Sequence, residues 1–241
     1  MDNILENSPE NDYFSNRSIN INSYFNYKLP KYYHEILPKN KEALILDIGC
    51  GLGQTLELIT KLGYKNTFGI DIDERAIEVC RDRNLNVSRI LDLKEFCKNE
   101  NTKFDFIIMS HVLEHIPKDE IVNTLRYIRE NLIASGGELV LFVPNAQSNT
   151  GCYWAYEDFT HHLLFTTGSI DYVLKSAGFK DIKFIDPLGI SDSTFILKFV
   201  KFVLLQLYKA NIKFWNKVTS SSYHKPSQQI YTYELKVIAK N

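Results

Sequence analysis

The chain has 241 residues, with 28 Lys and Arg against 29 Asp and Glu and a formal net charge of −1 at pH 7. This length and composition describe one globular domain with a short appendage. The small net charge disfavours binding to nucleic acid through bulk electrostatic attraction, so we expect no nucleic-acid partner. The cysteines form no Cys-x-x-Cys pair, which argues against a zinc cluster or a disulfide framework and favours reduced thiols.

The first 23 residues are rich in Asn, Ser and Asp without a sustained period, so we expect a flexible arm, followed by one domain over residues 24–241. This polar N-terminus lacks the layout of a secretory signal. The most apolar stretch, residues 195–208, is interrupted by lysines and is too short to span a bilayer, which takes about 20 apolar residues. We therefore expect the protein in the cytoplasm.

Aromatic and aliphatic residues at helical spacing predict an N-terminal helix over 24–37, broken at Pro30, whose tyrosines either close over a ligand or pack on the core. From residue 43 onward, short apolar runs alternate with helical patterns, which is typical of an α/β domain with a mainly parallel sheet. Strands are predicted over 43–48, 67–70, 87–91, 104–110, 137–143, 180–185 and 230–239. Helices are predicted over 54–62, 74–82, 119–132 and 169–177.

Three glycines stand between the first predicted strand and the helix that follows it. Gly49, Gly51 and Gly53 allow backbone angles that other residues avoid, and they let a ligand approach the main chain. Their spacing, Gly-x-Gly-x-Gly, is one residue shorter than the Gly-x-Gly-x-x-Gly pattern that seats a pyrophosphate. The loop therefore favours a nucleotide ligand without a pyrophosphate and disfavours an NAD-dependent oxidoreductase.

Acidic residues follow the next two predicted strands. Asp71 ends the second strand, where a carboxylate can accept hydrogen bonds from both hydroxyls of a ribose. Asp92 follows the third strand and could accept a hydrogen bond from an adenine amino group. The structural alternative is a tight turn together with two acids that cap helices.

Three ordered motifs, Leu-Asp-Ile-Gly-Cys-Gly-Leu-Gly, Gly-Ile-Asp and Phe-Asp-Phe-Ile-Ile-Met-Ser-His-Val-Leu-Glu-His, resemble those of class I S-adenosylmethionine-dependent methyltransferases. The likeness covers about residues 43–187 and the final strand. It implies a Rossmann-like, doubly wound seven-stranded sheet whose last strand alone is antiparallel, with S-adenosylmethionine as the cofactor. The implied cofactor-binding residues are Asp47, Gly49, Cys50, Gly51, Gly53, Gln54, Asp71, Ile72, Asp92, Leu93, Ser110 and His111.

Methyl transfer is an in-line displacement, so the enzyme must position the acceptor and, for a hydroxyl, help to remove its proton. Candidate groups follow the fourth predicted strand, because ligands bind at the carboxyl ends of parallel strands. His111 and His115 are four residues apart and would share a face of a helix, which is a spacing of metal ligands. We nevertheless expect no metal, since Glu114 is predicted to point aside and Pro117 marks a helix start soon after.

A second candidate segment, residues 152–166, follows the fifth predicted strand. Histidine titrates near neutral pH and suits a base for a hydroxyl, so His161 is the predicted catalytic base, with His162 as its substitute and His115 as a further catalytic candidate. The aromatic rings of the segment 152–166 suit stacking on a sugar. The alternative is that the segment is a lid whose aromatic rings pack on the core. The predicted substrate-binding residues are Tyr153, Trp154, Tyr156, Asp158 and Phe165.

The sequence Asp-Phe-Thr-His-His-Leu-Leu-Phe-Thr within that segment resembles one found in bacterial methyltransferases that modify sugars and polysaccharides. The likeness implies O-methylation of a small carbohydrate-like acceptor, such as a sugar or a nucleotide- or phosphate-linked precursor of a surface polysaccharide. Two alternatives stay open. The acceptor could be another small molecule, such as a quinone or a phosphorylated or phosphoramidate group, or the chain could be a catalytically silent partner that keeps the cofactor.

Residues 188–229 form an insertion before the last predicted strand. Over 195–215 the insertion is apolar and lacks acidic residues, and its lysines keep largely to one side of a predicted helix. We expect this helix to cap the substrate pocket or to contact a second subunit in a homodimer. A weak contact with an anionic membrane surface through 195–217 is the alternative.

Overall fold

The computed structural model describes residues 26–99 and 102–241, so the expected arm over 1–23 lies outside the described residues. One seven-stranded sheet runs in the order β3-β2-β1-β4-β5-β7-β6. Its strands are β1 (Ile45–Ile48), β2 (Thr67–Asp71), β3 (Val87–Arg89), β4 (Phe104–Ser110), β5 (Ile133–Pro144), β6 (Lys180–Phe184) and β7 (Glu234–Lys240).

The last strand alone runs against the others. β1 pairs in parallel with β2 and β4, β2 with β3, and β4 with β5, whereas β7 is antiparallel to both β5 and β6. This topology confirms the predicted fold class. The strand order reverses between β1 and β4, and a crevice for ligands opens at such a switch point, outside the carboxyl ends of the strands.

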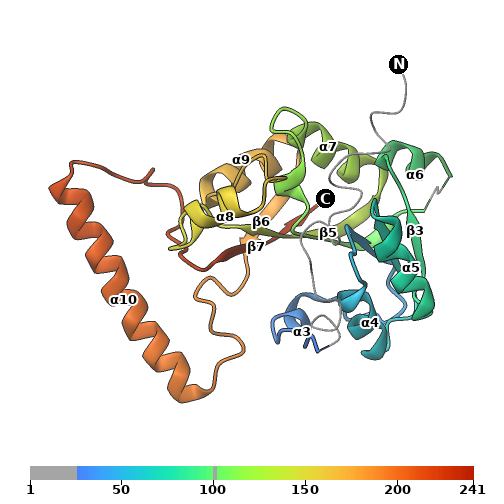
Figure 1. Cartoon of the computed structure of the whole chain (residues 1–241), viewed down its shortest axis with the longest axis horizontal. Coiled ribbons are helices and arrows are strands. Elements are labelled where there is room, and N and C mark those ends of the chain that lie inside the picture. The colour runs from blue at the N-terminus through green and yellow to red at the C-terminus, as the bar shows by residue number, and fades with distance from the viewer. Residues whose placement is uncertain (1–25, 100–101) are drawn as a thin grey trace.

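Helices cover both faces of the sheet (Figure 1). Side chains of successive strand residues point to opposite faces, so Ile45 packs in one cluster with Ile59, while Leu46 packs in another with Leu125. The helices of the first side are α3 (Tyr33–Ile36), α4 (Gln54–Lys61) and α5 (Glu74–Asp82). Those of the second side are α7 (Ile121–Asn131), α8 (Gly151–Glu157) and α9 (Thr167–Ser176).

The N-terminal helix is much shorter than predicted. The described residues before α3 form turns and irregular backbone, and only Tyr33–Ile36 are helical. The rings of Tyr32 and Tyr33 pack against Phe142 of β5 at centroid distances of 5.8 and 5.7 Å. Packing on the sheet, and not helix propensity, therefore fixes the position of this segment. These two tyrosines therefore belong to the core, as the packing alternative predicted.

Two short helices escaped the sequence analysis, α6 (Leu93–Asn99) and α8, together with a 3-10 turn, η3 (Leu113–His115). Each covers two turns or fewer, which is too short for an apolar period to show. The long elements after the N-terminal segment were predicted to within four residues at each end, and the largest differences are that β5 begins at Ile133 and β7 at Glu234.

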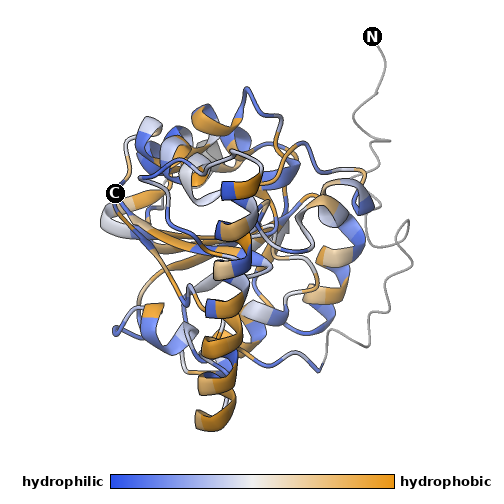
Figure 2. Ribbon diagram, turned by 90° about the vertical axis from the view of Figure 1, so that its left-hand side faces the viewer, coloured by the Kyte–Doolittle hydropathy of each residue, from blue (hydrophilic) through white to orange (hydrophobic). Residues whose placement is uncertain are grey.

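The insertion forms α10 (Phe195–Val218), a helix of 24 residues of which none is buried. The helix stands apart from the sheet in Figure 1, and Figure 2 shows that most of its length is hydrophobic. Its contacts with the domain include an edge-on meeting of the Tyr208 and Tyr231 rings at 5.4 Å. In this structure α10 therefore does not cap the substrate side of the sheet, and its contact with a second subunit or a membrane stays a prediction.

Within the described residues, no helix combines the length and the apolar character needed to cross a membrane.

The exposure of α10 predicts that its apolar face contributes little to the stability of the domain. Leu204 and Leu207 are 59% and 63% exposed, whereas Leu125 of α7 is fully buried. We expect the double variant Leu204→Gln/Leu207→Gln to change the free energy of unfolding by less than about 0.5 kcal/mol. Leu125→Gln, the matched core control, should cost about 3 kcal/mol or more. Urea unfolding followed by circular dichroism measures both, and a comparable loss in the α10 variant would show that this helix packs on the domain in solution.

Candidate functional site

The loop after β1 has backbone angles that favour glycine. Gly49, Gly51 and Gly53 have φ angles of +72°, +51° and +75°, in the left-handed region. At Gly49 the space is also filled, because a Cβ there would lie 2.2 Å from Cγ2 of Val112. The loop therefore needs small residues both for its turn and for its close contact with the segment after β4.

Asp71, at the end of β2, holds this loop through a hydrogen bond to its backbone. Its Oδ2 accepts a hydrogen bond from the Gly51 N–H at 2.7 Å, and its Oδ1 accepts one from the Asp73 N–H at 2.9 Å. Burial raises the pKa of Asp71, while these backbone N–H groups counteract the rise. Each carboxylate oxygen has a further lone pair, so the hydroxyls of a ribose can still bind here.

Two polar atoms beside the loop have no partner. Oδ1 of Asp47 and Oε1 of Gln54 are buried without a hydrogen bond among the described residues, and Gly53 gives α4 no side-chain cap. Burial, and then the charge of Asp71, raise the pKa of Asp47 to about 8. A ligand with an ammonium group and a carboxylate suits a buried acid beside a helix N-terminus. The amino-acid end of S-adenosylmethionine carries both groups, so the residues present fit this cofactor.

Asp92 follows β3 at the edge of the sheet and comes directly before α6, which begins at Leu93. Its Oδ1 accepts a hydrogen bond from the Lys94 N–H at 2.8 Å, so it performs the helix-capping role that was the alternative to an adenine contact. The Asp92 side chain is exposed and Leu93 is half-buried. The main-chain oxygen of Ile72 accepts a hydrogen bond from Nε of Arg89 at 3.0 Å. The adenine contacts of these residues stay predictions.

His111, directly after β4, lies between two carboxylates. Its Nδ1 is 3.2 Å from Oε1 of Glu114, and its Nε2 is 3.2 Å from Oε2 of Glu234. Burial alone would lower the pKa of His111, but these hydrogen bonds outweigh it and raise that pKa to about 10. The ring is then an imidazolium at neutral pH, with both nitrogens as donors. His111 is therefore unsuited to the metal-ligand pairing with His115 that its spacing suggested.

Aromatic rings continue from His111 toward α8. The ring of Tyr233 stacks on His111 at 6.0 Å, Trp154 lies tilted against Tyr233 at 6.3 Å, and Tyr153 meets Trp154 edge-on at 5.2 Å. We call Tyr153, Trp154 and Tyr233 the aromatic shelf. Tyr233 and Glu234 were not predicted, because they lie just before and at the start of β7, far along the chain from the other motifs.

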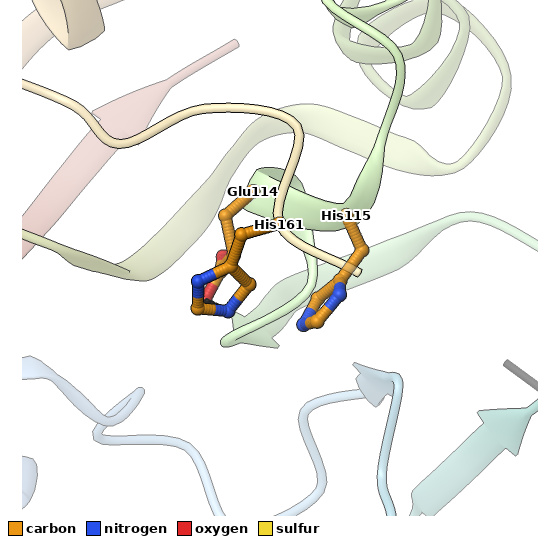
Figure 3. A group of neighbouring side chains, drawn as sticks. All are labelled: Glu114, His115 and His161. Carbon is orange, nitrogen blue, oxygen red and sulfur yellow. Dashed lines mark ion pairs between the residues drawn. The ribbon is translucent and has the colours of Figure 1, made fainter. Parts of the chain in front are cut away.

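Glu114, His115 and His161 come together in what we call the imidazole cluster (Figure 3). One donor atom from each residue lies within 4.8 Å of the others, and Oε1 of Glu114 is 3.9 Å from Nε2 of His161. The two imidazole rings meet edge-on at 4.7 Å. The prediction that Glu114 points aside was wrong, because η3 turns its fully buried carboxylate toward the histidines.

Hydrogen bonds determine which nitrogen of each imidazole carries the proton. Nδ1 of His161 lies 2.9 Å from the main-chain oxygen of Trp154, which can only accept, so Nδ1 donates. The Thr160 hydroxyl donates to Oδ1 of Asp158 at 2.6 Å, and it therefore accepts from Nδ1 of His115 at 2.8 Å. Burial lowers the pKa of His115. In its neutral form each ring thus carries its lone pair on Nε2, where it can take a proton or bind a cation.

The remaining predicted residues divide between surface and interior. Tyr156 is 81% exposed on α8, and the His162 side chain is also exposed outside the imidazole cluster. Asp158 is 4% exposed and already hydrogen-bonded, and Phe165 is fully buried in the core. The structure therefore assigns these last two to the interior, against the expected contact with substrate. Ser110 is half-buried at the end of β4, and Cys50 is buried beneath the glycine loop.

Comparison with known proteins gives one family across most of the chain. The sequence profile of a family described as a methyltransferase domain matches residues 21–183. The ribosomal protein L11 methyltransferase of Aquifex aeolicus is 34% identical over 79 residues, which are 31% of this chain and 32% of that protein. The ubiquinone biosynthesis O-methyltransferase of Bartonella tribocorum is 36% identical over 76 residues, 30% of each chain. The chain thus aligns with about a third of the length of these curated relatives.

Solved structures share the fold at low identity. A SAM-dependent methyltransferase from Archaeoglobus fulgidus has a TM-score of 0.62 at 23% identity, over 87% of this chain and 91% of that one. The magnesium protoporphyrin IX methyltransferase from Synechocystis, with bound SAH, has a TM-score of 0.59 at 12% identity over the whole of both chains. At these identities the likeness concerns the fold.

The contact between the glycine loop and Val112 gives a test with a matched control. Gly49 and Gly63 both have positive φ, and a side chain at either position carries a backbone cost of roughly 1 kcal/mol. Only at Gly49 would the new Cβ also meet another atom within 4 Å. We expect Gly49→Ala to weaken S-adenosylmethionine binding at least about tenfold, since steric overlap costs roughly 1–3 kcal/mol. Gly63→Ala should bind normally in titration calorimetry, and equal behaviour of the two variants would contradict the prediction.

Proposed function

Because this chain belongs to the methyltransferase-domain family, we propose that it transfers a methyl group from S-adenosylmethionine to an oxygen of a small carbohydrate-like acceptor. Membership in the family confirms the methyltransferase class and the S-adenosylmethionine cofactor expected from the motifs. The observation that carries the acceptor proposal is the aromatic shelf beside the imidazole cluster, at the carboxyl edge of the sheet.

The residues around the glycine loop would hold the cofactor. Asp47 suits its ammonium group, the uncapped start of α4 suits its carboxylate, and Asp71 suits its ribose. When bound, S-adenosylmethionine supplies a methyl carbon whose transfer forms a carbon–oxygen bond, breaks the carbon–sulfur bond with the electron pair left on sulfur, and releases the acceptor proton.

The acceptor would be held and deprotonated by one short stretch of chain. Trp154 offers a broad apolar ring on which the face of a sugar can lie. The main-chain oxygen of the same residue holds His161 in the tautomer that leaves Nε2 able to receive a proton. Trp154 of α8 would thus both position the acceptor and orient the histidine that removes its proton. His111, already an imidazolium, would act as a hydrogen-bond donor and not as a base.

A second acceptor class, an aromatic hydroxyl, has a specific observation in its favour. The similarity to a ubiquinone biosynthesis O-methyltransferase spans 76 residues, and the aromatic shelf could stack on an aromatic ring as well as on a sugar. The two classes differ in the acidity of the hydroxyl, because a phenol loses its proton near pH 10 and a sugar hydroxyl only at much higher pH. A sugar acceptor therefore depends more strongly on assisted proton removal.

Methyl uptake from labelled S-adenosylmethionine tests the proposal directly. We expect label in nucleotide sugars, sugar phosphates or polysaccharide fragments, and not in catechols. Asp71→Ala should weaken cofactor binding about tenfold or more, because it removes charge-assisted hydrogen bonds. His224→Gln, an exposed histidine remote from these residues in sequence, serves as the control. Label in catechols alone would favour the second class, and cofactor binding without transfer to either class would overturn the proposal in favour of a silent partner.

The raised pKa of Asp47 predicts that cofactor binding releases a proton. With a pKa of about 8, Asp47 is mostly protonated at pH 7, and an ammonium group bound beside it favours the ionised form. Calorimetry at pH 7 in phosphate and in Tris should show close to one more proton released by the wild type than by Asp47→Asn. This difference should shrink as the pH rises through 8, because Asp47 is then ionised before binding. Equal proton release by both proteins at pH 7 would contradict the assignment.

A further inference from the structure

The imidazole cluster contains the donor set of a metal site. Two imidazoles and one carboxylate, from His115, His161 and Glu114, place their donor atoms within 4.8 Å of one another. Catalytic zinc sites commonly have three such protein ligands and keep a further position open, and sites for non-haem iron use two histidines and one carboxylate. Figure 3 shows the three side chains side by side, two from η3 and one from the segment after α8.

The carboxylate of Glu114 is only half satisfied. Its Oε1 accepts a hydrogen bond from His111, whereas its Oε2 is buried and has no hydrogen-bond partner within the described ranges 26–99 and 102–241. The side chain is fully buried, so water does not supply the missing donor from the surface. A buried polar atom without a partner is costly. A cation held between this carboxylate and the imidazoles would provide the partner.

The hydrogen bonds behind the two imidazoles are those of metal ligands. A metal-bound histidine typically donates its other ring N–H to a carbonyl or to a group linked to a carboxylate, which fixes the tautomer and the ring orientation. Nδ1 of His161 donates to the main-chain oxygen of Trp154, and Nδ1 of His115 donates to Thr160, which in turn donates to Asp158. Both Nε2 atoms are therefore in the form that binds a cation, without a change of tautomer.

We propose that Glu114, His115 and His161 bind one divalent transition-metal cation. Bonds of about 2.1 Å would bring neighbouring ligand atoms to about 3.0–3.4 Å, so small side-chain rotations close the site from its present spacing. Asp158 lies at hand as a fourth donor, with Oδ2 3.7 Å from Nε2 of His161. We expected no metal because Glu114 was predicted to point aside. In the structure its carboxylate points toward the histidines, so that reason no longer holds.

The role of the cation rests on the proposed function, although its binding does not. A hydroxyl bound to the cation loses its proton to water more readily, as metal-bound water does. With the cation bound, Nε2 of His161 is a ligand and no longer receives the proton itself. The cation then takes over the part in proton removal that the metal-free site gives to that nitrogen, and His115 and His161 act through the metal.

Metal binding is tested first with Zn²⁺ alone, on the full chain stripped with a chelator. Equilibrium dialysis with elemental analysis should find one Zn²⁺ per chain, and Co²⁺ as a spectroscopic probe should show the absorption of a site with imidazole ligands. His115→Gln and His161→Gln should each weaken Zn²⁺ binding at least about tenfold. His224→Gln should bind as the wild type does.

A second pair of variants separates metal binding from folding. Thr160→Val removes the hydrogen bond to Nδ1 of His115 and should weaken Zn²⁺ about tenfold, whereas Thr160→Ser keeps the hydroxyl and should restore the affinity. Circular dichroism and S-adenosylmethionine binding should be unchanged in both variants, because neither readout depends on the metal.

The proposal is overturned if the folded wild type takes up no Zn²⁺, or if His115→Gln and His161→Gln bind it as well as the wild type. Zn²⁺ binding without methyl transfer to any acceptor would leave the site standing and refute the proposed function. Methyl transfer to a sugar that continues unchanged after chelation would overturn the role of the cation in proton removal.

Discussion

The buried carboxylate of Glu114 is the constraint on which both halves of the site depend. Its Oε1 accepts a hydrogen bond from His111, whose backbone has a left-handed conformation at the end of β4, with φ of +55°. Through His111 the interaction reaches Glu234, and so links β4 with the start of β7. On the other side the carboxylate faces His161, and the main-chain oxygen of Glu114 accepts a hydrogen bond from the His162 N–H at 2.8 Å. One buried group thus aligns the cofactor edge, the last strand and the acceptor segment.

The cofactor half of the site could be predicted from the sequence because its signals are local. Glycine is required at Gly49 and its neighbours by the backbone angles and the close packing of the loop, and this loop directly follows a strand. Asp71 ends a strand that its apolar residues make easy to predict. The pairing of β1 with β2 then brings Asp71 to Gly51. The short apolar runs of the buried strands likewise predicted the sheet, since both of its faces are covered.

The acceptor half could be predicted only in part, because the rest of it is assembled from segments far apart in the chain. Tyr233 and Glu234 reach His111 only through the antiparallel placement of β7 beside β5. Glu114 was misplaced because an α-helical spacing was assumed, whereas a 3-10 turn directs successive side chains differently. Phe165 shows the opposite error, since an aromatic residue in a polar segment suggested a binding surface and lies in the core.

The placement of α10 leaves the pairing of the sheet independent of the insertion that contains this helix. The helix leaves after β6 and returns before β7, and these two strands are antiparallel hydrogen-bonded neighbours. A tight hairpin could therefore join them, and the residues between, α10 included, are an elaboration that the pairing of the two strands does not require. Because none of its residues is buried, the helix can vary in sequence and in length while the packing of the sheet stays the same.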